Sequence, residues 1–149
     1  MLEIAGDIWA FHNQGYWVAV TTNGSLKKDG TAVMGKGTAL QAVQRWPDLP
    51  RMLGRRLTAG GNHTILWPSM GLITYPTKYR WWEGSSLDLI KHSAEEMVML
   101  VEARRLVQEV PMPIYMPRLG CGYGGLLWSQ VQPAIADILP DWVVVTYQV

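Results

Sequence analysis

The sequence predicts an α/β domain in which a mixed β-sheet carries helices on both faces. Short apolar and β-branched segments typical of strands alternate along the chain with amphipathic segments typical of helices. Residues 142–147 contain three consecutive valines, which indicates a strand buried on both faces of a sheet. Ligands bind such sheets at the carboxyl ends of the strands. The loops after Thr22, Tyr75 and Met116 are therefore expected to meet around one site.

The first half of the chain is predicted from its composition and from its Gly and Pro residues. Pro47 ends a helix, because proline lacks the amide N–H and its ring clashes with the preceding turn. Apolar, β-branched segments on either side of residues 68–71 indicate a pair of strands. In order, we expect strands at 2–5 and 17–22, a Gly- and Lys-rich loop at 24–36, helices at 38–46 and 49–57, and strands at 64–67 and 72–75.

The clearest helix covers residues 86–107, where apolar residues recur at spacings of three and four. Ser85 is expected to cap this helix. Pro133 is expected near the start of the last helix, where a missing N–H costs least. The apolar face of the long helix contains Leu87, Ile90, Ala94, Met97 and Val101. A strand at 114–116, a helix at 129–139 and the strand at 142–147 complete the predicted order.

Length and composition limit the classes of protein. The 149 residues suit one domain, expected to span residues 1–149, and a net charge of +1 excludes a strongly basic nucleic-acid-coating protein. A single cysteine excludes a disulfide framework, and no apolar run approaches a membrane span. We therefore expect a cytoplasmic monomer with no membrane partner. His12, His63 and His92 lack the spacing of metal ligands, so neither a metal nor a cofactor is expected.

Two Gly-rich segments lead into predicted helices. Residues 120–125 hold four glycines between a strand and a helix, an order that gathers backbone N–H groups around a phosphate. The alternative is a tight turn that needs positive φ. Residues 34–39 also open a helix, and the alternative there is an ordinary left-handed turn. Together the two segments favour a diphosphate site with a sugar site beside it.

Polar side chains at the ends of predicted strands are candidates for chemistry. Lys78 follows a predicted strand by three residues. Partial desolvation would lower its pKa and make it a nucleophile. The alternative is an ordinary surface lysine. The Asn23 side chain could hydrogen-bond to a ribose hydroxyl or to its own backbone. Asp7 suits an adenine amino group or the capping of a turn. The aromatic run at 79–82 favours base stacking, so single-stranded DNA is a candidate partner.

Taken together, these segments resemble the macro domain family. The resemblance is closest to its branch of ADP-ribosyl glycohydrolases, which includes the human terminal ADP-ribose protein glycohydrolase and bacterial antitoxin macro domains that remove ADP-ribose from thymidine bases in DNA. The patterns MGKG and MPRLGCGxGGLxW are the most specific, and the motifs keep the family order from residue 6 to residue 128. They comprise residues 6–8, 22–23, 34–39, 75–78, 117–126 and Trp128.

The resemblance implies a three-layer α/β/α macro domain that binds ADP-ribose or an ADP-ribosylated macromolecule. Asp7 and Ile8 would contact adenine, with Tyr147 or Val149 closing that pocket. Lys78 would be the catalytic lysine near the distal ribose, which Asn23 would orient. The ribose would be lined by Gly35, Lys36 and Gly37, and the diphosphate wrapped by Leu119, Gly120, Cys121, Gly122, Tyr123, Gly124 and Gly125, with Thr38 and Arg118 completing the binding set.

The chain also departs from the family pattern. The human-type enzyme has an aspartate where this chain has Gly124, although antitoxin-like sequences share the glycine. Where the antitoxin-like sequences have Leu-Asp-Trp, this chain has Leu127 in place of the aspartate. Residues 27–30 are an insertion relative to the antitoxin-like pattern. We expect an enzyme that hydrolyses ADP-ribose from a DNA thymidine base or a protein carboxylate. The alternatives are a reader that binds ADP-ribose without cleaving it and a phosphatase acting on ADP-ribose 1″-phosphate.

Overall fold

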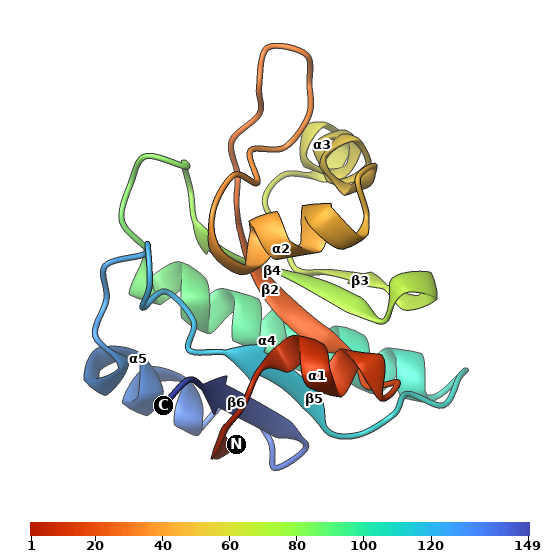
Figure 1. The fold of residues 1–149 in the computed structure, drawn as a ribbon, viewed down its shortest axis with the longest axis vertical. Helices are drawn as coiled ribbons and strands as arrows, with labels where there is room; N and C mark the ends of the chain where they lie inside the picture. Colours follow the sequence, from red (N-terminus) through yellow and green to blue (C-terminus); the bar gives the residue numbers. More distant parts are fainter.

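The computed structural model describes all 149 residues, from Met1 to Val149, and its centre is a six-stranded mixed sheet (Figure 1). The strand order is β1-β6-β5-β2-β4-β3. All neighbouring strands run parallel except β3, which pairs antiparallel with β4 at one edge. The strands are β1 (Leu2–Ala5), β2 (Val18–Asn23), β3 (Ile65–Trp67), β4 (Leu72–Lys78), β5 (Ile114–Pro117) and β6 (Val143–Tyr147). The predicted mixed α/β sheet is confirmed.

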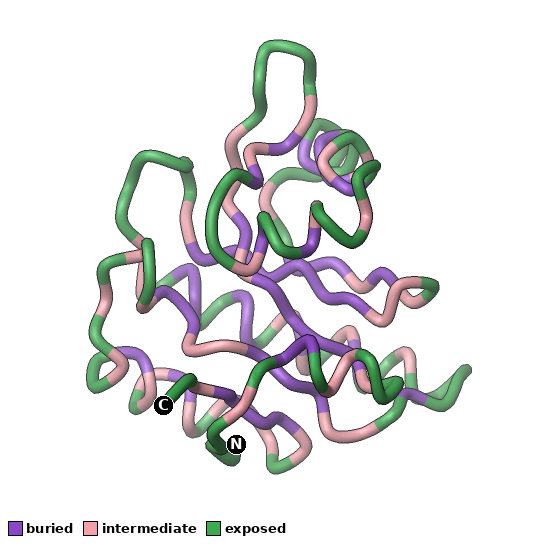
Figure 2. Tube along the Cα trace, in the orientation of Figure 1, coloured by how far each residue is buried: buried purple, intermediate pink, exposed green.

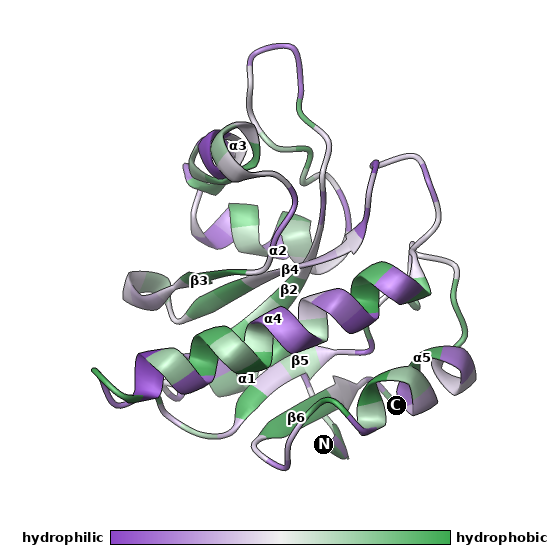
Figure 3. Ribbon diagram, turned by 180° about the vertical axis from the view of Figure 1, so that it is seen from behind, coloured by the Kyte–Doolittle hydropathy of each residue, from purple (hydrophilic) through white to green (hydrophobic).

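Helices cover both faces of the sheet and form three layers with it. The helices are α1 (Ile8–Asn13), α2 (Gly37–Arg45), α3 (Leu49–Gly60), the 3₁₀ turn η1 (Pro68–Met70), α4 (Leu87–Arg105) and α5 (Trp128–Ala136). One apolar core joins α4 and α5 to the sheet, and a second core on the other face joins α1, α2 and α3 to it. Figure 2 shows β2 to β6 mostly buried between these layers and the edge strand β1 exposed, and Figure 3 shows α4 lying across the sheet from the opposite side. None of the helices combines the length and apolar character that a membrane crossing requires.

Two local predictions about the helices are wrong, and one helix was not predicted. The sequence analysis missed α1, which begins after Asp7, whose carboxylate accepts a hydrogen bond from the Trp9 N–H at 3.0 Å. The cap of α4 is Ser86 and not Ser85, because the Ser86 hydroxyl accepts from the Leu89 N–H at 3.3 Å. Pro133 lies inside α5, beyond the first turn where its missing N–H would cost nothing.

The loops that follow the parallel strands lie together at the carboxyl ends of those strands, as expected. The bulge between Thr22 and Asn23 shifts the register of β2 against β4 and pairs Asn23 with Lys78. In Figure 1 the loops after β2, β4 and β5 project from this same edge, and Figure 2 shows that their tips are exposed. The edge is therefore where polar groups from distant parts of the sequence come together.

Candidate functional site

A cavity of about 640 Å³ lies at the carboxyl ends of β2, β4 and β5. Its walls come from the ends of these strands, the start of α2 and the Gly-rich loop after β5. Four side chains predicted from sequence meet here: Asn23, Lys36, Lys78 and Arg118. Cavities of this size hold small organic ligands and cofactors.

A second cavity of about 360 Å³ lies beside the first, at the carboxyl ends of β1, β5 and β6. Asp7, Ile8 and Tyr147, three of the residues expected near adenine, line this cavity. The two cavities share Thr38, Pro117 and Arg118. They therefore form two compartments of one elongated site, although Val149 is fully exposed and lines neither.

Arg118 is the one cationic side chain shared by the two compartments. Its guanidinium lies 4.6 Å from the Tyr147 ring centre and 5.6 Å from that of Trp128, which restricts its orientation. Glu3 is 3.8 Å away, a long contact at the edge of ion-pair range. The buried Nε of Arg118 has no hydrogen-bond partner. An anionic group bridging the compartments would meet this side chain.

Lys78 closes the other side of the large compartment. Its ammonium donates a hydrogen bond to the Tyr123 carbonyl oxygen at 3.3 Å. Partial burial lowers the pKa of Lys78 below its ordinary value, and the nearby positive charge of Lys36 lowers that pKa further. Lys36 in turn lies 5.2 Å from the Tyr123 ring centre. Two cations therefore line one pocket, and the pKa of Lys78 is lowered there.

Asn23 uses its side chain to hold the following loop. Its Oδ1 accepts a hydrogen bond from the Ser25 N–H at 2.9 Å, and its Nδ2 donates to the Val33 carbonyl at 3.0 Å. Of the two roles expected for Asn23, the backbone role is therefore present. One N–H and one lone pair are left over for a ligand in the cavity it lines. Asn62, which the sequence analysis missed, supports the same region by donating to the Lys78 carbonyl at 3.0 Å.

The Gly-rich loop presents only part of its length to the cavity. Gly122, Tyr123 and Gly124 line it, whereas Leu119, Gly120, Cys121 and Gly125 line neither compartment. Leu119 and Gly120 are buried, and the Cys121 thiol donates to the Leu119 carbonyl at 3.4 Å. Burial raises the pKa of this thiol above its ordinary value, so Cys121 packs within the loop and is not poised as a thiolate nucleophile.

Gly124 has no room for a side chain. A Cβ at this position would overlap the Ser85 hydroxyl oxygen and the Gly120 carbonyl. The Gly124 carbonyl also accepts the Ser85 N–H at 2.9 Å, which fastens the loop to the segment before α4. The aspartate of the human-type enzymes therefore does not fit this loop conformation. The buried Ser85 hydroxyl lines the cavity and has no hydrogen-bond partner.

The start of α2 contributes backbone N–H groups to the pocket. Gly35, Lys36 and Gly37 are exposed at the mouth, and the helix begins after Lys36 without a side-chain cap. Thr38 accepts a hydrogen bond from the Thr21 N–H at 3.2 Å, which fixes this helix start against β2. Uncapped N–H groups at a helix N-terminus favour an anion or an acceptor oxygen.

The rim of the large compartment contains two residues that the sequence analysis did not assign to the pocket. Trp81 lines the cavity with a side chain that is 53% exposed, and its N–H donates to the Ser25 hydroxyl at 2.9 Å. Lys27 lines the same cavity from the inserted loop. Tyr79 and Trp82 are also exposed beside them. The motif spacing gives no sign that the insertion and the aromatic run meet at one rim.

Comparisons with known proteins agree with this fold. The sequence matches no protein-family model. The structure superposes with a TM-score of 0.76 on the macrodomain of Mycobacterium tuberculosis DarG, at 22% identity, covering 99% of this chain and 97% of that one. It superposes equally, with a TM-score of 0.76 and 23% identity, on Thermosipho africanus DarTG in complex with ADP-ribose, covering 99% of this chain and 41% of that one.

Comparison of the sequence with curated proteins also finds relatives that act on ADP-ribose. The chain is 27% identical over 116 residues to a DNA ADP-ribosyl glycohydrolase of Thermus aquaticus, covering 72% of this chain and 31% of that protein. It is 30% identical over 128 residues to a DNA ADP-ribosyl glycohydrolase of Mycobacterium tuberculosis, covering 77% of this chain and 35% of that protein. The chain therefore spans about a third of the length of the curated relatives it matches.

The fold is that of a macro domain. Within that class, its curated relatives are the DNA ADP-ribosyl glycohydrolases, and its structural neighbours include the macrodomains of DarG.

Proposed function

We propose that this macro domain binds ADP-ribose across the two compartments and hydrolyses it from a modified thymidine base in DNA. The small compartment, with Asp7, Ile8 and Tyr147, would hold adenine. Arg118, at the junction, would meet the diphosphate. The distal ribose would then lie in the large compartment beside Lys78. The single observation that carries the proposal is this partly buried lysine, with its lowered pKa, at the end of an elongated site.

In the proposed reaction the unprotonated amine of Lys78 attacks C1″ of the distal ribose while the bond from C1″ to the thymine nitrogen breaks. The transition state has oxocarbenium character, as in glycoside hydrolysis. The base leaves with the electron pair and takes a proton from the lysine nitrogen. Water then gives its hydroxyl to C1″ and its proton to that nitrogen, which releases ADP-ribose and restores Lys78. Asn23 would orient the ribose with its remaining N–H or lone pair.

Single-stranded DNA is the acceptor that the rim favours. Trp81, Tyr79 and Trp82 expose aromatic faces beside the mouth, and Lys27 and Lys28 add positive charge from the inserted loop. Aromatic faces combined with cations are how proteins hold single strands without reading their sequence. A protein carboxylate would use none of these faces. The proposal includes a monomer that acts in the cytoplasm, where the thiol of Cys121 stays reduced.

The decisive experiment supplies wild type and Lys78→Ala with a thymidine-ADP-ribosylated oligonucleotide and, separately, with a glutamyl-ADP-ribosylated protein. We expect ADP-ribose release from the oligonucleotide by wild type, and release reduced by about a hundredfold or more in the variant. If wild type releases ADP-ribose from neither substrate, the proposed enzymatic activity is overturned. Unchanged release by the variant would overturn only the role of Lys78. Preferential release from the protein would replace DNA by a carboxylate as acceptor.

A reader without activity is the second candidate, and the packing around Gly124 favours it. The loop leaves no space for a carboxylate there, and Leu127 supplies none at the start of α5. Calorimetry that finds ADP-ribose binding, together with no turnover of either substrate, would identify the reader. Phosphate release from ADP-ribose 1″-phosphate would identify the phosphatase instead.

A further inference from the structure

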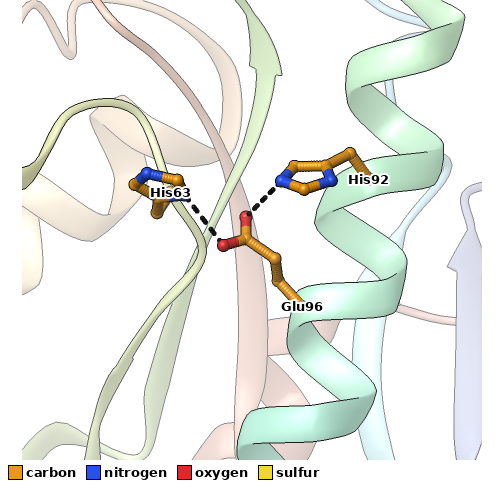
Figure 4. Close-up of side chains that lie close together, drawn as sticks. All are labelled: His63, His92 and Glu96. Carbon is orange, nitrogen blue, oxygen red and sulfur yellow. Dashed lines mark hydrogen bonds and ion pairs between the residues drawn. The ribbon is translucent and has the colours of Figure 1, made fainter.

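Three side chains that line neither compartment converge on another face of the molecule (Figure 4). The Nδ1 atom of His63 lies 2.8 Å from one carboxylate oxygen of Glu96, and the Nε2 atom of His92 lies 3.6 Å from the other. All three ligand atoms lie within 4.8 Å of one another. Two imidazoles and a carboxylate are a donor set that zinc binds in proteins.

The three residues come from two segments of the chain. His92 and Glu96 are four residues apart on α4, so both side chains project from the same side of the helix. His63 lies in the connection between α3 and β3, 33 residues before Glu96. The sequence analysis expected no metal, because the histidines have no ligand-like spacing along the chain. His92 and Glu96 are nevertheless paired across one helical turn, and the fold brings in His63 as a third ligand.

The positions allow a metal ion after small side-chain rotations. Tetrahedral ligands about 2.0–2.1 Å from a zinc ion lie about 3.4 Å from one another. The more distant donors must therefore approach, and the hydrogen-bonded His63 and Glu96 atoms, 2.8 Å apart, must separate slightly as the ion replaces the shared proton. The His63 and His92 side chains are 53% and 56% exposed, which leaves them free to rotate. Glu96, at 17% exposed, is held by the Thr64 N–H, which donates to its Oε1 at 3.3 Å. A fixed carboxylate between two adjustable imidazoles is a partly organised site.

We propose that His63, His92 and Glu96 bind one divalent transition-metal ion, with zinc as the occupant and water in the fourth position. The ion fastens the segment before β3 to α4. Asn62, the neighbour of His63, donates to the Lys78 carbonyl at 3.0 Å. The metal therefore holds the segment that supports the end of β4, where Lys78 lines the large compartment. This site does not depend on the activity proposed above.

The test is isothermal titration calorimetry of the untagged chain with zinc sulfate in a buffer that does not chelate zinc. We expect one ion per chain, with His63→Ala and His92→Ala each weakening binding by about tenfold or more, because each removes a ligand. Glu95→Gln is the matched control, since Glu95 is an exposed carboxylate on the same helix, adjacent to Glu96. This variant should bind zinc as wild type does.

Thermal unfolding and cobalt substitution provide independent readouts. Zinc should raise the Tm of wild type and of Glu95→Gln but not that of His92→Ala, because an ion that binds only the folded state stabilises it. Cobalt should give the visible absorption of a tetrahedral site in wild type and lose it in His63→Ala. No heat of binding at zinc concentrations on the order of 100 µM, or equal affinities in wild type and both histidine variants, would overturn the site. The cluster would then be a set of hydrogen-bonded surface side chains only.

Discussion

The ammonium of Lys78 donates a hydrogen bond to the carbonyl oxygen of Tyr123, 3.3 Å away, and this contact joins the end of β4 to the Gly-rich loop. The same tyrosine ring lies 5.2 Å from the Lys36 ammonium. The loop that would wrap a diphosphate is thus positioned partly by the lysine proposed to attack C1″. A neutral Lys78 amine can still donate to this carbonyl, so deprotonation does not require the loop to open.

The first prediction concerns the pH dependence of Lys78. Burial and the charge of Lys36 both disfavour the ammonium, so the pKa of Lys78 lies below 10.5 and the reactive amine forms at a lower pH than in an ordinary lysine. The single-turnover rate of ADP-ribose release should rise with pH and level off as this amine forms. Lys36→Met removes one of the two causes, and the profile should shift to higher pH.

The control for this shift is Lys28→Met, which removes an equal charge from the exposed inserted loop. Lys28 does not contribute to the pKa shift of Lys78, so the pH profile of Lys28→Met should keep the midpoint of the wild-type profile. Coincident profiles for Lys36→Met and wild type would show that the titrating group is not a Lys78 amine influenced by Lys36.

The second prediction compares two glycines of one loop. Gly124→Ala places a methyl group against the Ser85 hydroxyl and the Gly120 carbonyl, and backbone at that contact cannot rotate away. We expect the free energy of unfolding to fall by about 1–3 kcal/mol, the usual cost of overpacking. Gly122→Ala is the control, because a Cβ there meets no heavy atom within 4 Å and its φ is not positive. Urea unfolding measures both, and equal stabilities would contradict the packing argument.

Much of this architecture could be predicted from the sequence, for local reasons. Every strand was expected from its apolar or β-branched composition, and the helices after Lys36, Asp48 and Ser86 from periodicity and breakers. Helix α1 was not, because its six residues are too few to define a period. Its cap is Asp7, for which the sequence suggested two roles, contact with adenine and the capping of a turn. The Asp7 side chain caps the helix, and the residue also lines the small compartment.

Features made by contacts between distant segments could not be predicted. Ser85 fixes Gly124, Asn62 supports Lys78, and Trp81 donates to Ser25, across separations of 39, 16 and 56 residues. The expected sheet predicts which loops gather at the carboxyl ends of the strands, but no local pattern encodes which of their residues will touch. Periodicity places a side chain on a face of its own element, whereas these contacts depend on how the elements pack together.

The third prediction concerns Arg118. Replacing it with Met keeps an unbranched side chain against Tyr147 and Trp128 but removes the charge between the compartments. ADP-ribose binding should weaken by about tenfold or more, since a hydrogen bond to a charged group contributes about 1.5–3 kcal/mol. Calorimetry at two salt concentrations should show weaker salt dependence in the variant than in wild type.

Glu3→Gln provides the matched test of that charge. Glu3 lies 3.8 Å from the guanidinium, so removing its negative charge leaves Arg118 in place with one fewer competitor for an anion. Binding of ADP-ribose should be unchanged or tighter. Equal losses in Glu3→Gln and Arg118→Met would mean that the pair supports the fold and does not meet the diphosphate.

The last prediction separates the acceptor from the nucleotide. Trp81 lies at the rim with 53% of its surface exposed, in the wall nearest the inserted loop and beyond the groups expected to hold adenine and diphosphate. Trp81→Ala should raise KM for a thymidine-ADP-ribosylated oligonucleotide by about fivefold to a hundredfold, as the loss of one stacked base at about 1–3 kcal/mol implies. Calorimetric affinity for free ADP-ribose should stay close to that of wild type. Met99→Ala, which removes an exposed apolar side chain from α4, should change neither quantity. If Trp81→Ala weakens the binding of free ADP-ribose as much as the binding of the oligonucleotide, the tryptophan contacts the nucleotide and the rim is not the DNA-binding surface.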